Sequence, residues 1–315
     1  MATGPLPGIG LHSHLMSEKT PFISVVIPCR GHAAALSRCL ATVISQELDE
    51  AFEVIVVDAA ADDGVARVVR EHPHARIVRS VEPLLPGQAR NLGARSARGT
   101  YLAFIDADCI ASPGWLTAAV LALEEGARMV GGPVLHGEPW HPVAVIDNLL
   151  QFSDMSAGRP RGPARLLPTC NLAIALADFT RLQGFPEVAL PAGEDVLFCN
   201  RAAQRWPGKM LFCPGMRVHH FGRSGLRQLW SHQELFGFVR AMYGLELNST
   251  YRWLGRFAIT APAVGLKRLS YIALRAARWQ PMSLAAMLLF LPVLLFAMTA
   301  WCSGFHRGCC EWSAA

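Results

Sequence analysis

The chain has 315 residues, of which 52% are hydrophobic and 17% are charged, and it carries a formal net charge of +5. This length allows one large domain or two small ones around a sizeable core. Nine cysteines without Cys-x-x-Cys spacing argue against a zinc site or a disulfide framework, and they favour free thiols in a reducing compartment.

Residues 1–20 are rich in Gly, Pro, His and Ser and lack the charged and then apolar stretches of a secretory signal. We expect a disordered leader. The next 105 residues alternate short apolar runs with stretches of helical periodicity. We predict strands over 22–28, 52–58, 75–79 and 101–105, with helices over 33–46, 65–71, 88–98 and 113–125. Such alternation predicts an α/β domain with a mainly parallel sheet.

Polar side chains end three of these strands, at the edge where parallel sheets bind ligands. Pro28 and Arg30 close the first strand, and Asp58 closes the second. Asp106 and Asp108 follow the fourth strand, two positions apart. We expect these groups, which come from separate segments, to line one site.

The Asp106 and Asp108 pair predicts a metal site. Residues i and i+2 point the same way on extended backbone, so the two carboxylates can converge. Hard oxygen donors suit Mg²⁺ or Mn²⁺ and, through the metal, a diphosphate. The alternative is an Asp-rich turn or a helix cap. Capping is less favoured because Ser112-Pro113 already suits the start of the next helix.

The second half is less regular. We predict a strand over 129–134, a strand carrying Asn171, and a helix over 192–204 that opens with Glu194 and Asp195. Asn171 is either a satisfied polar group within its strand or a hydrogen-bond donor to a ligand. Acids in a first helical turn also suit the helix dipole, so Glu194 and Asp195 alone do not define a site.

The C-terminal part predicts a membrane segment. Residues 282–302 contain no charged side chain and would form a helix of about 30 Å, the thickness of a bilayer core. We expect a transmembrane helix over 281–303, with Pro292 tolerated as a kink, and a tail over 304–315. Seven basic residues against one acid in 247–315 predict basic amphipathic interfacial helices over 241–280 and a cytoplasmic orientation. No nucleic-acid partner is expected.

An ordered series of motifs resembles the family 2 glycosyltransferases, which have the GT-A fold. The motifs span 21–237 and read SVVIPCR, VIVVDAAADD, GQARNLGARSARGTYLAFIDADC, PTCNLAIA, GFPE, GEDVLFCNRA and VHHFGRSGL. The resemblance implies inverting transfer of a hexosyl group from a nucleotide-sugar, with Mg²⁺ or Mn²⁺ as cofactor.

The resemblance also implies roles for individual residues. Asp58 matches the acid that contacts the nucleobase, and Arg90 matches a basic residue near the nucleotide. Asp108 matches the metal ligand of the D-x-D pair, while Asp106 lies nearer the ribose and also serves the metal set. Asp195 matches the catalytic base.

His220 matches a histidine beside the metal or diphosphate, although the His219-His220 pair alone is more often a packed surface pair. Pro28, Arg30, Asn171 and Glu194 complete the expected nucleotide-sugar site, and Arg223 is a weaker candidate for the phosphates.

Two departures from the family pattern matter. The loop after the second strand reads Ala59-Ala60-Ala61 in place of a glycine-serine stretch, which leaves UDP, GDP and TDP donors open. The Gln-x-x-Arg-Trp signature of processive synthases is absent from the sequence, which favours addition of a single sugar.

We therefore expect a membrane-anchored glycosyltransferase of the cell membrane, with its catalytic domain facing the cytoplasm and a lipid-linked or cell-envelope acceptor. The first alternative is a catalytically degenerate protein that binds nucleotide-sugar at the membrane. The second is a sugar-nucleotidyltransferase, which is disfavoured because residues 28–32 are poor in glycine.

Overall fold

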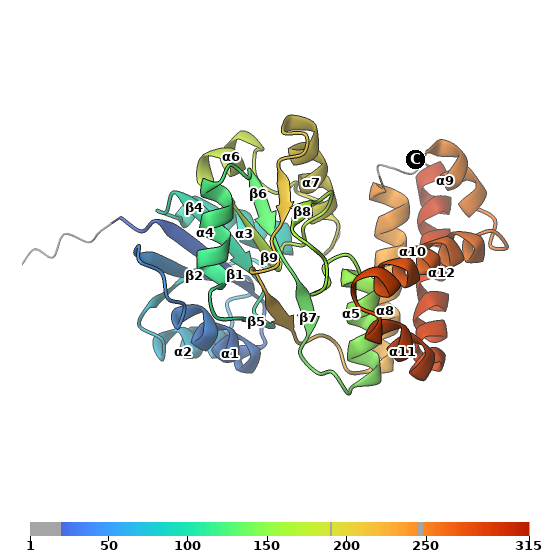
Figure 1. Ribbon diagram of the computed structural model, residues 1–315, viewed down its shortest axis with the longest axis horizontal. Coiled ribbons are helices and arrows are strands. Elements are labelled where there is room, and N and C mark those ends of the chain that lie inside the picture. The colour runs from blue at the N-terminus through green and yellow to red at the C-terminus, as the bar shows by residue number, and fades with distance from the viewer. Residues whose placement is uncertain (1–19, 190, 245–247, 315) are drawn as a thin grey trace, which may run out of the picture.

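The computed structural model describes residues 20–189, 191–244 and 248–314. The predicted leader, except for its last residue, lies outside the described residues. A sheet-containing part lies on the left of Figure 1 and a group of C-terminal helices on the right, with α5 and α8 between them.

The first half of the chain forms the predicted α/β alternation. Its elements are β1 (Ile23–Cys29), α1 (Ala33–Ile44), β2 (Phe52–Asp58), α2 (Asp63–Arg70), β3 (Ala75–Arg79), α3 (Pro86–Ser96), β4 (Tyr101–Ile105), β5 (Cys109–Ala111) and α4 (Trp115–Glu124). Strands β3, β2, β1 and β4 lie side by side and run parallel. Strands β1, β2 and β4 are almost wholly buried because helices cover the sheet, which explains their continuous apolar runs.

The second half extends the sheet and adds a smaller one. Its elements are β6 (Met129–Gly131), β7 (Val134–His136), α5 (Pro142–Phe152), β8 (Gly162–Pro163), β9 (Asn171–Ala175), α6 (Leu176–Arg181), α7 (Glu194–Arg205), β10 (Met210–Phe212) and β11 (Val218–His220). The large sheet has the order β3-β2-β1-β4-β9-β6-β10-β8, in which β9 runs antiparallel to both neighbours. The small sheet has the order β5-β11-β7. The α/β fold with a mostly parallel central sheet is therefore confirmed.

The strand predicted over 129–134 is divided between the two sheets. Gly132 and Pro133 separate β6 from β7, and proline cannot donate to a strand ladder. A Cβ atom at Gly132 would lie 2.1 Å from the carbonyl oxygen of Met216, so only glycine permits this close approach. The break places the end of β7 beside β11, away from the main sheet.

Within residues 226–244 and 248–314, which the structure describes, five helices form the C-terminal part. They are α8 (Leu226–Tyr243), α9 (Ser249–Gly255), α10 (Ala261–Trp279), α11 (Met282–Leu289) and α12 (Leu291–Ala314). The single helix predicted over 281–303 is wrong, because α11 and α12 meet at an angle of 85° and α12 continues through the predicted tail. Pro292 lies in the first turn of α12. N–H groups of a first turn have no partner within the helix, so the missing N–H costs nothing there, and the fixed φ of proline favours the start of a new helix.

Among the residues that the structure describes, no single helix has both the length and the apolar composition needed to cross a membrane. The α11–α12 pair has the required length and apolar composition only when both helices are counted together.

Helix α12 packs closely against α8. A Cβ atom at Gly304 would lie 1.8 Å from the carbonyl oxygen of Glu234, and one at Gly237 would lie 2.0 Å from that of Trp301. Glycine at both positions lets the two backbones touch. An ion pair between Arg307 and Glu234, with Nη1 and Oε1 3.0 Å apart, joins the same helices. The C-terminal helices are thus fixed to α8.

Candidate active site

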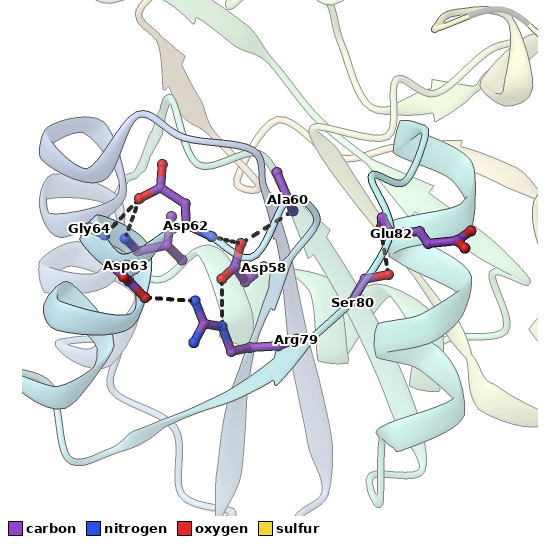
Figure 2. Close-up of polar contacts among 9 residues, drawn as sticks. Asp58, Ala60, Asp62, Asp63, Gly64, Arg79, Ser80 and Glu82 are labelled. Carbon is purple, nitrogen blue, oxygen red and sulfur yellow. Dashed lines mark hydrogen bonds and ion pairs between the residues drawn. The ribbon is translucent and has the colours of Figure 1, made fainter.

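Asp58 organises the loop that follows β2 (Figure 2). Its side chain is fully buried, and Oδ1 accepts hydrogen bonds from the backbone N–H groups of Ala60 (3.3 Å) and Asp62 (3.0 Å). Oδ2 accepts from Nε of Arg79 at 3.0 Å. These three hydrogen bonds fix the buried carboxylate within the loop. Its contact with a nucleobase stays a prediction.

The same loop contains a strained alanine. Ala61 has a φ of 52°, in the left-handed region that glycine occupies at little cost. Asp62 then caps α2 by accepting from the N–H groups of Gly64 (2.6 Å) and Val65 (3.4 Å). Alanine is thus compatible with the conformation of this loop, but at position 61 it has a steric cost that a glycine would not have.

Arg90, on α3, connects two acids from distant parts of the chain. Nη2 lies 2.5 Å from Oδ1 of Asp106, and Nη1 lies 2.8 Å from Oε1 of Glu194. Burial alone would lower the pKa of Arg90, but the charges of Asp106 and Glu194 raise it above its ordinary value. Arg90 and Glu194 were expected to bind the nucleotide-sugar. In the structure they pair with each other inside the protein, and their contact with a nucleotide-sugar stays a prediction.

Asp106 and Asp108 separate because they do not lie on extended backbone. Strand β4 ends at Ile105 and a turn follows, so the two-residue alternation no longer applies. The Asp106 carboxylate is directed to Arg90, whereas Asp108 meets His220. A shared metal ligand set that includes Asp106 is therefore not formed in this structure.

The small sheet brings His220 to Asp108. Strand β11 pairs with β5 so that His220 lies opposite Cys109, and Nε2 of His220 is 3.6 Å from Oδ2 of Asp108. Burial alone would raise the pKa of Asp108, yet His220 and Arg223 hold it below its ordinary value. Burial alone would lower the pKa of His220, and Asp108 raises it.

Asp108 and His220 fit a divalent cation as a two-ligand set. Two donor atoms 3.6 Å apart can both lie about 2.1 Å from one ion. A carboxylate and an imidazole together suit Mn²⁺. Among residues 20–189, 191–244 and 248–314, no group of three His, Cys, Asp or Glu side chains gathers in a way that could hold a metal. Substrate phosphate and water would have to complete the coordination.

Asp195 is the second residue of α7 and follows Glu194 of the Arg90–Glu194 pair. Burial and the charge of Glu194 raise the pKa of Asp195 to about 7, and Oδ1 accepts from the N–H of Val196 at 2.8 Å. Gly193 directly precedes α7 and has a φ of 100°. A Cβ atom at Gly193 would lie 2.9 Å from a methyl group of Val239 on α8. A carboxylate with a pKa near neutrality is suited to accept a proton.

Asn171 is a structural residue, which corrects its assignment to the sugar site. It is fully buried, and its Oδ1 accepts from Nε1 of Trp115 at 2.9 Å. Its Nδ2 donates to the carbonyl oxygens of Pro133 (3.1 Å) and Met216 (2.7 Å). These bonds use both amide hydrogens, so Asn171 has none left for a ligand.

Pro28 and Arg30 lie at the carboxyl end of β1, next to the Asp58 loop. Cys29, between them, is paired in register with Asp58. Pro28 is half-buried and Arg30 is exposed. Arg30 is thus the candidate binding residue on this strand end whose charged group faces solvent.

A second polar cluster was not predicted. Asp147 on α5 is buried and lies 2.8 Å from Nδ1 of His232 and 2.8 Å from Nε2 of Gln233, both on α8. Arg223 approaches the same carboxylate at 3.6 Å. Burial alone would raise the pKa of Asp147, but His232 above all holds it below its ordinary value. The signal in the sequence was the single charged residue of α5.

Comparison with known proteins identifies the fold. The crystal structure of GalNAc-T7 with UDP, GalNAc and Mn²⁺ has a TM-score of 0.56 at 19% identity and covers 76% of this chain and 51% of that one. The mannosyltransferase PcManGT from Pyrobaculum calidifontis, in complex with GDP-Man and Mn²⁺, has a TM-score of 0.55 at 18% identity. The match covers 94% of this chain and 84% of that one. The fold is therefore of the GT-A type.

The family model "Glycosyl transferase family 2" matches residues 24–142, and this match supports the resemblance to that family. Glycosyltransferase AglE of Haloferax volcanii is 30% identical over 193 residues, which cover 59% of this chain and 63% of that protein. Validoxylamine A glucosyltransferase of Streptomyces hygroscopicus subsp. limoneus is 30% identical over 217 residues, which cover 58% of this chain and 46% of that protein. The chain thus spans about half to two thirds of the length of these curated relatives.

Proposed function

We propose that the protein is an inverting, metal-dependent glycosyltransferase that moves one sugar from a nucleotide-sugar to an acceptor hydroxyl. The supporting observation is the position of Arg90. Its guanidinium joins the turn that carries Asp106 and Asp108 to the first turn of α7, which carries Asp195. The candidate cation ligand and the candidate base therefore lie on two segments held by one buried side chain.

The donor diphosphate carries about two negative charges, which Asp108 alone would repel. A bound Mg²⁺ or Mn²⁺ would supply positive charge that stabilises the departing nucleoside diphosphate. Asp108 and His220 would hold this ion. Arg30 and Arg223 would add charge-assisted hydrogen bonds to phosphate oxygens.

Asp195 acts as the general base. Its carboxylate takes the proton of the acceptor hydroxyl while the hydroxyl oxygen attacks the anomeric carbon. The bond to the diphosphate breaks on the opposite face, and its electron pair leaves with the nucleoside diphosphate, so the configuration inverts. General base catalysis contributes about 10²–10⁴ in rate. The pKa of about 7 matches this task because about half of the groups are ionised at neutral pH and the carboxylate is basic enough to accept the proton.

We also propose that the enzyme works at the cell membrane, with its catalytic domain facing the cytoplasm and a lipid-linked or cell-envelope acceptor. Large apolar side chains on α9 and α10 are exposed, among them Trp253, Leu266 and Leu274. Basic side chains lie between them along the chain, which is the composition of an interfacial helix. Anchoring raises the effective concentration of a membrane-bound acceptor.

The test is a donor screen with the full-length chain. UDP-, GDP- and TDP-sugars are added with and without Mn²⁺, and donor binding is read by thermal shift and turnover by release of nucleoside diphosphate. Asp195→Asn should bind the donor and lose turnover, while the exposed control Asp49→Asn should keep both. Metal-dependent donor binding by the wild type without turnover would favour the degenerate binding protein instead.

A further inference from the structure

A cavity of about 760 Å³ lies between the catalytic domain and the C-terminal helices. Its walls come from β7, α5, the end of α10 and α11, and they are mainly apolar. Its rim includes Trp140, Met282 and Leu288, which are 88%, 77% and 75% exposed. A volume of this size is typical of a small-molecule site, and exposed apolar groups at its mouth favour an apolar ligand.

Three polar groups in the cavity wall have no partner. The buried atoms Nδ1 of His136, Nδ2 of Asn148 and Oγ of Ser156 make no hydrogen bond to the described protein. Asn148 and Ser156 are only 9% and 7% exposed. A buried polar atom without a partner costs about 1–3 kcal/mol, so three in one wall indicate a ligand that supplies hydrogen-bonding groups.

The cavity adjoins the candidate active site. The ring of Phe152, in the cavity wall, meets the ring of His220 edge-on with centroids 5.4 Å apart. His136, also in the wall, pairs in register with His220 across β7 and β11. A ligand bound here would therefore have one end near His220, a proposed cation ligand, and the other at the apolar rim formed with α11.

The cavity wall also limits the ligand's charge. None of the described residues that line the cavity is Asp, Glu, Lys or Arg. Arg275 donates to Ser153 in the wall at 3.3 Å, but it is also paired with Asp154. A phosphate head in this cavity would therefore lose its hydration without gaining an unpaired cation, which is costly. Hydroxyl and ester groups would instead satisfy the three free polar atoms.

We propose that this cavity binds a lipid with an uncharged, hydroxyl-bearing head, of the class of diacylglycerols and neutral glycolipids. The hydrocarbon chain lies along α11 toward the exposed rim, and the head lies among His136, Asn148 and Ser156. As an assignment of the acceptor, the inference rests on the proposed function, because the lipid hydroxyl is then the group that receives the sugar.

The test is photolabelling of the full-length chain in detergent micelles. The probe is a diacylglycerol with a diazirine in one acyl chain, and its competitor is the phosphatidic acid with the same chains. We expect labelled peptides from α5 and α11, with diacylglycerol labelling about tenfold stronger than phosphatidic acid labelling. Neither donor nor Mn²⁺ is present, so a failure of sugar transfer and a failure of lipid binding remain distinguishable.

Variants locate the site. Ala286→Trp fills the cavity and should lower diacylglycerol labelling about tenfold, while Ala277→Trp, on the exposed side of α10, should leave it unchanged. Asn148→Leu keeps the apolar walls and removes one donor to the lipid head, so it should weaken diacylglycerol labelling, though less than Ala286→Trp does.

Equal labelling of wild type and Ala286→Trp, stronger labelling by phosphatidic acid, or wild-type labels confined to other helices would each overturn the proposal. The wild-type peptide map decides the matter even where a variant does not fold.

Discussion

Arg90 and Glu194 lie 104 positions apart in the chain and form a buried ion pair in which Nη1 and Oε1 are 2.8 Å apart. The guanidinium also holds Asp106. One side chain therefore joins α3, the turn after β4 and the start of α7. The geometry of the proposed active site depends on this junction.

Removing the guanidinium should destabilise the fold. Arg90→Met leaves the Glu194 carboxylate buried without its partner, and breaking a buried ion pair in this way costs about 3–5 kcal/mol. We expect the lower end of this range because Asp106 is partly exposed. Urea unfolding measures the loss.

Arg95→Met is the matched control, because Arg95 is an exposed residue of the same helix. Adding Glu194→Gln to Arg90→Met should recover part of the lost stability, since no ionised group then stays buried. Equal unfolding midpoints for Arg90→Met and Arg95→Met would contradict the proposed role.

Asp195 should give the reaction its pH dependence. The base must be ionised, and the pKa of Asp195 is raised to about 7. Below this pH, kcat/KM for the donor that the screen selects should fall about tenfold per pH unit, and above it the rate should level off. A profile that stays flat between pH 5 and 8 would argue against Asp195 as the base.

The same pKa predicts that stability falls with rising pH, whereas activity rises. In the unfolded chain Asp195 ionises near its ordinary pKa of 3.8, whereas the folded protein retains the proton to about 7. The folded form therefore binds more protons between these values, and the contribution of this group to the free energy of unfolding falls as pH rises from about 4 to 7. Asp195→Asn should be more stable than wild type at pH 8 by about 1–2 kcal/mol. Thermal unfolding at pH 5 and pH 8 measures the change, and a variant that gains no stability at pH 8 would contradict it.

The two acids of the D-x-D pair should differ in their effect on the metal. Asp108 lies with His220, whereas Asp106 is held by Arg90. Asp108→Asn should abolish the increase in Tm that Mn²⁺ gives in the presence of the selected nucleoside diphosphate. Asp106→Asn should lower the starting Tm and keep that increase. Loss of the Mn²⁺ effect in Asp106→Asn would assign both acids to the ion.

The C-terminal helices should depend on glycine at position 304. A Cβ atom there would lie 1.8 Å from the carbonyl oxygen of Glu234, so Gly304→Ala must push α12 away from α8. Overpacking of this kind costs about 1–3 kcal/mol. Gly162→Ala, where no atom lies within 4 Å of the added Cβ, is the control. Equal thermal unfolding of both variants would show that α12 is not docked as described.

The sequence by itself determined the alternation of the first half. The runs over 52–58, 75–79 and 101–105 coincide with β2, β3 and β4. Strands β2 and β4 follow from a local pattern, because a strand buried on both faces must be apolar, whereas β3 is half-buried at the edge of the sheet. The same patterns predicted where β1, β2 and β4 end, and therefore that Arg30, Asp58 and Asp108 lie at or just after a strand end.

Only the tertiary structure decided which partner each polar group meets. Asp106 turned to Arg90 because the chain bends after Ile105, and Asn171 turned inward to the carbonyl oxygens of Pro133 and Met216. The 85° angle between α11 and α12 likewise accompanies the packing of α12 on α8, which composition does not encode. Hydrogen bonds and close backbone approaches join residues distant in the chain, so their geometry exists only once the sheets and helices have assembled.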